Sequence, residues 1–301
     1  MNTDITTCAF CGNPAELKES HIIPGFVYDW LKETSGTGYL RFSQTPNKRE
    51  QDGLKIPLLC QDCEETFAVW EKYVSENIFK PIHDDPAQRR VYRKGLAKFS
   101  ASVSWRVVTF LNSKGGFKHF SDKLKESRDR ALQRWKDFLT NKEQNPGSYE
   151  LHMLPLGGIA ETSDPNTPPN MNRYLLRTVD IDAACTKTAA FVYAKMCHLL
   201  LIGFIEMPTA KHWRGTKLHI NRGFIGGKVH YCIPANFAEY LKSRAHRTAQ
   251  SEGLLSQRQW GKITDAYQKD PDRAANSETI RSMDFDVMLL EHLRNRQVDL
   301  I

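Results

Sequence analysis

The chain carries Cys8-Ala9-Phe10-Cys11 near its N-terminus and Cys60-Gln61-Asp62-Cys63 about fifty residues later, with Glu19-Ser20-His21-Ile22-Ile23-Pro24 between them. Each Cys-x-x-Cys pair places two thiolates on one tight turn, and two such pairs complete the tetrahedral ligand set that Zn²⁺ prefers. We therefore expect one structural zinc ion bound by Cys8, Cys11, Cys60 and Cys63. A redox dithiol is the weaker alternative, because zinc explains two pairs better.

His21 is the only histidine between the two cysteine pairs. A lone histidine in an apolar Ile-Ile-Pro setting is weak evidence of function, since it can simply be a satisfied core residue. Within a four-cysteine clasp it is the best catalytic candidate, because a rigidly held neutral imidazole can accept a proton from water. Both interpretations of His21 remain open at this point.

Charge and composition favour an anionic partner. The 301 residues carry a net charge of +7 and a pI of about 9.0, with 40% hydrophobic and 26% charged residues. Nucleic acid fits such a charge, as would a membrane surface, a very acidic protein or no specific partner. Seven cysteines and the absence of an N-terminal secretion signal favour a reducing compartment, which predicts a cytoplasmic location.

The N-terminal segment predicts a strand, a long insertion, a second strand and a helix. Residues 16–23 are expected to form the strand with His21, and residues 26–32 a helix. Residues 39–42 suggest a further strand, and residues 54–59 lead into the second cysteine pair. Apolar residues at three- and four-residue spacing, from Phe67 to Ile78, predict a helix after Cys63. Zinc would stabilise this strand–turn–strand–helix unit, which buries few apolar residues.

The remaining chain predicts mixed helices and strands. Residues 81–90 look like a boundary, and His83-Asp84-Asp85 there is either a metal site or, more simply, a solvated turn. The apolar run at 189–205 contains Lys195 and His198, so we expect a buried core helix rather than a membrane span. Other expected helices are 91–111, 120–141, 236–249 with Asn236 as its cap, and the last fifty residues. Expected strands are 149–156 and 174–181, together with a hairpin formed by 217–220 and 228–233 around Gly223, Gly226 and Gly227.

Residues 86–150 concentrate the positive charge. They contain fifteen Lys and Arg against six Asp and Glu, a balance of +9, so the rest of the chain is slightly acidic. An ordinary solvated helix face is one explanation. The clustering favours a segment that faces nucleic acid.

The paired cysteines, the Ser20-His21-Ile22-Ile23-Pro24 run and Leu58-Leu59-Cys60-x-x-Cys63-Glu64 together resemble the HNH, or ββα-metal, endonucleases of the zinc-knuckle type. The resemblance covers residues 8–80, about a quarter of the chain. It implies an α+β protein in which a small zinc-bound ββα module, HNH-like or treble-clef-like, precedes a larger mixed helical and β domain. The expected divisions are a nuclease module at 1–85, a basic helical segment at 86–148 and a C-terminal α+β domain at 149–301.

The resemblance also implies roles for individual residues. His21 would be the general base, and a catalytic Mg²⁺ or Mn²⁺ would be held by Glu19 or Ser20 before it and by Glu64 after the second cysteine pair. The family's usual histidine or asparagine at the helix position is Glu64 here. The family's middle asparagine has no clean counterpart in this sequence: Asn47, the catalytic candidate for that role, lies farther from Cys60 than usual, and Asp52 is nearer.

The expected function is therefore a metal-dependent endonuclease that hydrolyses phosphodiester bonds in nucleic acid, DNA before RNA. Joining such a module to a larger region suggests an antiviral defence effector, and a protein partner or a homo-oligomer is compatible with it. The alternative is a non-catalytic zinc-ribbon protein that binds nucleic acid or serves as an adaptor.

Overall fold

The computed structural model describes residues 6–298. The chain forms two compact units, each assembled from separate segments. Within the described residues, unit 1 comprises 6–26, 54–155 and 179–232, and unit 2 comprises 27–53, 156–178 and 233–298. The division at residues 85 and 148 expected from the sequence uses contiguous segments and stays a prediction.

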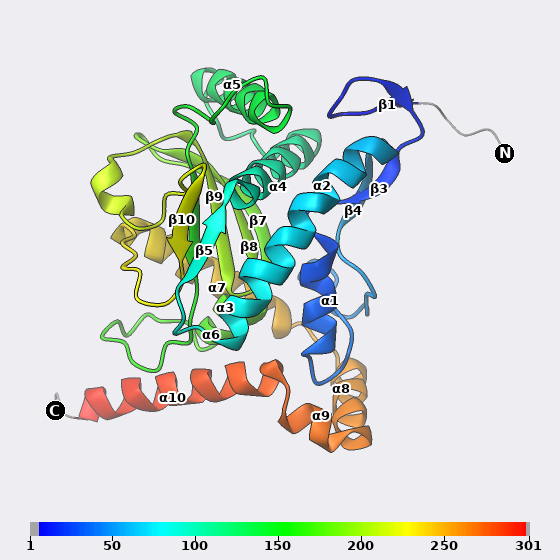
Figure 1. Ribbon diagram of the computed structural model, residues 1–301. Helices are drawn as coiled ribbons and strands as arrows, with labels where there is room; N and C mark the ends of the chain where they lie inside the picture. The colour runs from blue at the N-terminus through cyan, green and yellow to red at the C-terminus, as the bar shows by residue number, and fades with distance from the viewer. Residues whose placement is uncertain (1–5, 299–301) are drawn as a thin grey trace. The chain divides into compact units, whose positions relative to one another are not determined.

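Unit 1 is built on a four-stranded sheet in the order β6-β9-β8-β7, three strands of which (β7, β8 and β9) are labelled in Figure 1. Its strands are β6 (Leu151–Pro155), β7 (Val179–Cys185), β8 (Ala190–Met196) and β9 (Leu199–Glu206). All neighbouring strands pair antiparallel. β8 is buried along its whole length and β9 along all but its last residue, as expected for the two central strands of a covered sheet.

Two helices pack on this sheet: α4 (Lys94–Ser113) contacts all four strands, and α5 (Asp122–Leu139) lies against α4 and β9. Their close approach depends on Gly203 in β9. A Cβ at Gly203 would lie 2.6 Å from the Ser104 hydroxyl and 2.9 Å from the Trp135 ring, so any side chain there would collide with both helices. The absent side chain therefore sets the distance between the sheet and its helical layer.

The N-terminal part of unit 1 contains the predicted strand–strand–helix order. β1 (Thr6–Thr7) pairs with β2 (Pro14–Ala15), and β3 (Lys18–His21) pairs antiparallel with β4 (Lys55–Leu59). α2 (Gln61–Val74) follows directly and packs on α4; it continues through a π-helical turn, η1 (Ser75–Phe79), into α3 (Lys80–Asp84). Phe10, Phe67 and Trp105 meet edge-to-face, joining the first cysteine turn, α2 and α4 in one aromatic cluster.

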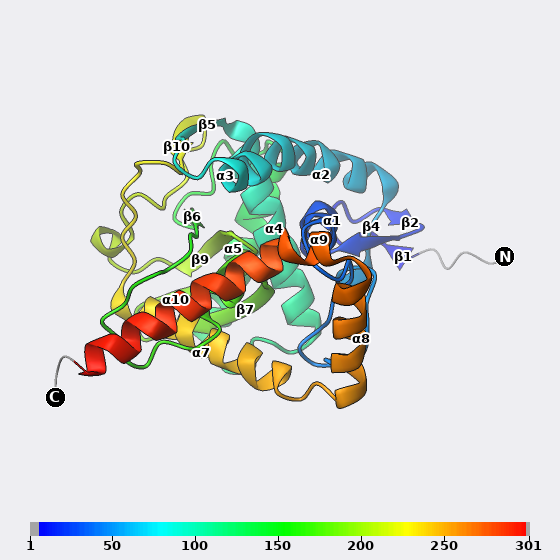
Figure 2. The ribbon, with the colours of Figure 1, turned by 90° about the horizontal axis from the view of Figure 1, so that it is seen from below.

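Unit 2 is helical. It contains most of α1 (Gly25–Glu33), α6 (Met171–Arg177), α7 (Ala235–Glu252), α8 (Gln257–Lys269), α9 (Pro271–Ala275) and α10 (Glu278–Val298). The short α9 joins α8 to α10, which run in different directions (Figure 2). Arg177 anchors the end of α1, because its guanidinium donates to the Thr34 hydroxyl and the Leu31 carbonyl and lies over the Trp30 ring.

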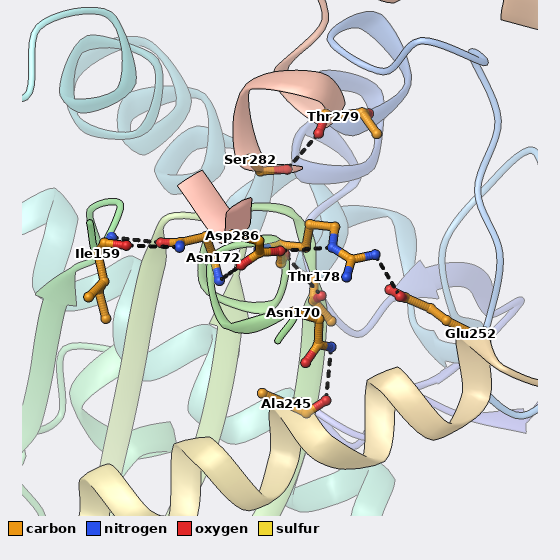
Figure 3. A network of polar contacts seen from close by, with 10 residues as sticks. Ile159, Asn170, Asn172, Thr178, Ala245, Glu252, Thr279, Ser282 and Asp286 are labelled. Atoms are coloured by element: carbon orange, nitrogen blue, oxygen red, sulfur yellow. Dashed lines mark hydrogen bonds and ion pairs between the residues drawn. The ribbon is translucent and has the colours of Figure 1, made fainter. Parts of the chain in front are cut away.

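The buried carboxylate of Asp286 holds α6 to α10 (Figure 3). Through its ion pair with Arg173 it is also connected to α7. Asp286 of α10 accepts hydrogen bonds from the backbone amides of Asn172 and Arg173, the second and third residues of α6, at 2.6 and 3.4 Å. Arg173 neutralises it at 2.8 Å and also pairs with Glu252 at 2.8 Å. Asp286 is 4% exposed, so it caps α6 from another helix while its charge is balanced inside unit 2.

The structure contradicts the core helix expected at 189–205. Those residues form β8 and β9, joined by a tight turn in which Cys197 adopts φ 54°. Lys195 is buried and donates to the Cys197 carbonyl at 3.0 Å, so the charge that interrupts the apolar run lies at the end of the hairpin. Strands buried on both faces show no alternation, and an apolar run of this kind has no period that separates it from a helix.

Several smaller predictions are also corrected. Residues 171–177 form α6, so the strand expected at 174–181 is only β7, which begins at Val179. Residues 39–42 form a single bridge between Leu40 and Glu50. α7 begins after Pro234, and Asn236 does not cap it. Helix continues to Asp84, inside the expected boundary at 81–90. The helices after Cys63, at 120–141 and in the last fifty residues are confirmed, as is the strand at 149–156.

The hairpin expected at 217–233 is wrong. β10 (Arg222–Ile225) pairs instead with β5 (Arg90–Arg93), which occupies the start of the helix expected at 91–111. Gly223 lies directly over Tyr92, and a Cβ there would be 2.2 Å from the Tyr92 hydroxyl, so the glycine permits this contact rather than a turn. Between residues 6 and 298 the chain forms no helix long and apolar enough to cross a bilayer.

A four-cysteine candidate metal centre

The first cysteine pair lies on a turn closed by backbone hydrogen bonds. The Cys8 amide donates to the Asn13 carbonyl and the Gly12 amide to the Cys8 carbonyl, both at 2.9 Å. Gly12 has φ 84°, a left-handed conformation that glycine adopts without strain. The Ala9 amide donates to the Leu58 carbonyl at 3.0 Å, so this turn is attached to the end of β4.

The second cysteine pair lies at the N-terminus of α2. Cys60 is the residue before the helix, and Cys63 is in its first turn. The unpaired amides of a helix N-terminus stabilise thiolates there. Because β4 ends where α2 begins, the attachment of the first turn to β4 brings the two pairs together.

The four sulfur atoms form one cluster. All four Sγ atoms lie within 4.8 Å of one another, and those of Cys11 and Cys60 are 3.8 Å apart. Tetrahedral zinc with Zn–S bonds of about 2.3 Å places its sulfurs about 3.8 Å apart. The cluster therefore has the size of a tetrahedral thiolate site, and Cys8, Cys11, Cys60 and Cys63 are close enough to bind one metal ion, as the zinc prediction requires.

The protein environment favours the thiolate form of Cys8 and disfavours that of Cys63. Burial raises the pKa of the Cys8 thiol, yet hydrogen bonds from the backbone amides of Cys11, Cys60 and Phe10 outweigh it and lower that pKa to about 7. Burial and the neighbouring cysteines raise the pKa of the Cys63 thiol. A divalent cation bound between the four sulfur atoms would offset the repulsion between neighbouring thiolates. A thiol that coordinates such an ion is deprotonated outright.

His21 lies at the last position of β3, opposite Lys55 of β4. Its imidazole packs over Gly25, the first residue of α1: a Cβ at Gly25 would be 3.1 Å from the ring carbon Cε1. The side chain is half-buried, and the His21 carbonyl accepts a hydrogen bond from Arg106 Nη1 at 2.9 Å. The backbone of this candidate base is thus held from α4.

Arg106 also reaches the helix that follows the second cysteine pair. Its Nη2 forms an ion pair with Glu71 of α2 at 2.7 Å, and the guanidinium lies near the Phe67 ring. Arg106 is 2% exposed. The buried guanidinium of Arg106 therefore connects β3, which carries His21, to α2. Sequence reasoning missed both Arg106 and Glu71, although the alternating Ser100, Ser102 and Ser104 signal a helix buried on more than one face.

The other residues of the expected site have distinct surroundings. Glu19 is exposed on β3, whereas Ser20 is buried, with its hydroxyl accepting from the Leu59 amide at 3.2 Å. Ser20 thus has a structural role in the β3–β4 pairing. Glu64 lies in the first turn of α2, and its Oε1 is buried without a hydrogen-bond partner among the described residues. That orphaned acceptor is suited to a cation.

Asn47 belongs to unit 2, where both ends of its side-chain amide are engaged. Nδ2 donates to the Leu254 carbonyl at 2.9 Å, and Oδ1 accepts from the Ser256 amide at 2.7 Å, just before α8. Asp52 also lies in unit 2 and accepts from the Gly53 amide at 2.7 Å. Both residues have a clear local structural role there, and the catalytic role of Asn47 stays a prediction.

Among the described residues, the four cysteines alone form a group of three or more potential ligands at metal-binding separation. His83 pairs with Asp84 at 3.1 Å at the end of α3 but, within residues 6–298, does not belong to a group of potential metal ligands. Three of the fifteen basic side chains in residues 86–150 are buried, namely Lys98, Arg106 and Arg128. These three side chains therefore contribute to the interior of the protein, and the positive charge of the segment is not all available to a partner.

Comparison with known proteins adds no relative. No protein-family model, no curated protein and no solved structure matches this chain.

Proposed function

We propose that this protein is a metal-dependent endonuclease of the HNH type that cleaves DNA. The observation that carries the proposal is the order β3–β4–α2 around the cysteine cluster, with His21 at the end of β3 and Glu64 immediately after Cys63. The resemblance of residues 8–80 implies two strands and a helix in this order, and this supports the proposal. The four cysteines would have a structural role and hold the strand and the helix together.

The proposed roles follow from the residue chemistry. The His21 imidazole accepts a proton from the attacking water, while Arg106 holds the backbone of His21 in place. Glu64 supplies a carboxylate to a Mg²⁺ or Mn²⁺ ion, with the exposed Glu19 as a second donor from β3. Such an ion stabilises charge on the scissile phosphate and leaving oxygen. Mg²⁺ commonly uses one or two carboxylates together with substrate phosphate, so a pre-formed cage of protein ligands is not required.

Cleavage of supercoiled plasmid with Mg²⁺ or Mn²⁺ tests the proposal. His21→Ala should lower the cleavage rate by roughly 10² to 10⁴ with zinc content unchanged, because it removes only the general base. Glu64→Ala should lower metal affinity, so that part of the activity returns at higher Mg²⁺. His119→Ala is the matched control, since His119 is an exposed histidine of unit 1. If His21→Ala cuts DNA as fast as the parent, the assignment is wrong.

The second candidate is a zinc-stabilised binding or adaptor protein. The observation that favours it is Asn47, whose side-chain nitrogen and oxygen each form a hydrogen bond to the backbone within unit 2, although the resemblance assigns that position a catalytic role. In that case no plasmid is cut under any metal condition, and His21→Ala lowers the stability of unit 1 rather than a reaction rate.

A further inference from the structure

The β5–β10 ribbon of unit 1 has an outer face that the proposed chemistry does not use. Residues alternate between the two faces along both strands: on the inner face Tyr92, Gly223 and Ile225 are buried and Arg90 is half-buried. On the outer face all four residues are exposed, namely Val91, Arg93, Arg222 and Phe224. Within residues 6–298 the two strands form a two-stranded sheet of their own. Their outer face is therefore a narrow double-stranded strip.

The outer face carries two positive charges that lie directly opposite each other, one on each strand. Arg93 and Arg222 are direct cross-strand partners, and like charges at such a position destabilise a strand pair. Neither arginine forms an ion pair with a carboxylate within residues 6–298, and the eight residues of the two strands include no acidic residue. An anion bound between the two guanidinium groups would turn this repulsion into attraction.

Exposed apolar side chains accompany the charges. Phe224 is 45% exposed and Val91 46% exposed, and they too are direct cross-strand partners. The Arg89 guanidinium lies 4.1 Å from the centre of the Phe224 ring. A strip that combines three exposed arginines with an aromatic and a β-branched side chain has the composition of a nucleic-acid contact, in which cations meet phosphates and apolar atoms meet bases.

We infer that the outer face of the β5–β10 ribbon binds duplex DNA. The major groove of B-form DNA, about 12 Å wide, admits a two-stranded ribbon, whereas the deep, narrow major groove of A-form RNA does not. Arg89 covers one face of the Phe224 ring, which disfavours that ring as a stacking platform for single-stranded bases. The inference rests on the proposed function for the choice of DNA, but it concerns binding and does not require cleavage.

The test is fluorescence anisotropy with a labelled 20-base-pair DNA duplex, performed with full-length protein carrying His21→Ala and without added Mg²⁺ or Mn²⁺. The double change Arg93→Ala and Arg222→Ala should weaken binding about tenfold or more, and it should reduce the slope of log affinity against log salt by about 2. Both side chains are exposed and repel each other, so thermal unfolding should occur at the same temperature or slightly higher. Phe224→Ser should weaken binding without changing the salt slope, because it removes no charge.

The matched control replaces Lys114 and Lys118, two exposed cations of unit 1 in the loop after α4, with alanine. Equal weakening by this control pair would show diffuse attraction and overturn the inference, as would unchanged affinity in the ribbon variant. Tighter binding to single-stranded DNA or duplex RNA than to duplex DNA would also overturn it. If duplex binding depends on the ribbon but the parent protein does not cut plasmid, the DNA-binding surface is supported and the nuclease proposal is wrong.

Discussion

Replacing Arg106 with methionine should destabilise unit 1 and disable the proposed active site together. The guanidinium is 2% exposed, donates to the His21 carbonyl at 2.9 Å and pairs with Glu71 at 2.7 Å. Methionine fills similar volume, so the change removes polar contacts more than packing. Removing one partner of a buried ion pair costs about 3–5 kcal/mol, and Glu71 retains 21% side-chain exposure, so we expect about 3 kcal/mol.

Urea unfolding followed by tryptophan fluorescence measures this loss. A change of about 3 kcal/mol corresponds to a melting temperature lower by roughly 6–12 °C for a unit of this size. Arg128→Met is the matched control: that arginine is also buried, but its partners are Asn112 and Asp129. In a double-mutant cycle, Arg106→Met and Glu71→Gln should be non-additive by about 1–3 kcal/mol, because each change removes the same ion pair.

The functional part of this prediction is separate. At a temperature where Arg106→Met is folded, its plasmid cleavage should fall well below that of Arg128→Met, because the strand that carries His21 has lost its anchor. Arg106→Lys should be intermediate, since one ammonium cannot reproduce the two-pronged contact of the guanidinium. Equal stability of the two methionine variants would refute the anchoring role, and equal cleavage would refute its connection to His21.

Three further changes have expected outcomes. Cys63→Ser should abolish stoichiometric zinc in metal analysis and expose the N-terminal part of unit 1 to proteolysis, whereas Cys232→Ser, outside the cluster, should retain zinc. Asp286→Ala should lower the stability of unit 2 by about 3–5 kcal/mol in urea unfolding, because Arg173 and the first amides of α6 lose their partner. Asp284 is exposed on the same helix, so Asp284→Ala should have little effect. Gly203→Ala should destabilise unit 1 by about 1–3 kcal/mol through collision with α4 and α5, and an unchanged melting temperature would contradict the packing described for β9.

Local patterns in the sequence were sufficient for the cysteine cluster and for most helices. The Cys-x-x-Cys spacing is itself a turn geometry, so predicting that Cys8, Cys11, Cys60 and Cys63 meet required only that two turns come together. The amphipathic spacing after Cys63 likewise predicted α2, because a helix with one buried face records its period in the sequence. The strand with His21 was identified from the residues around it.

The tertiary structure decided what has no local signature. The hairpin of β8 and β9 is buried on both faces, so its sequence has no alternation to distinguish it from a core helix. β5 and β10 pair across about 130 residues, and the short run at Arg90–Arg93 becomes a strand only because Arg222–Ile225 supplies its hydrogen bonds. The anchoring of β3 by Arg106, and of α6 by Asp286, also joins distant segments. Such contacts depend on which distant elements pack together, and no local pattern of residues in the sequence indicates these pairings.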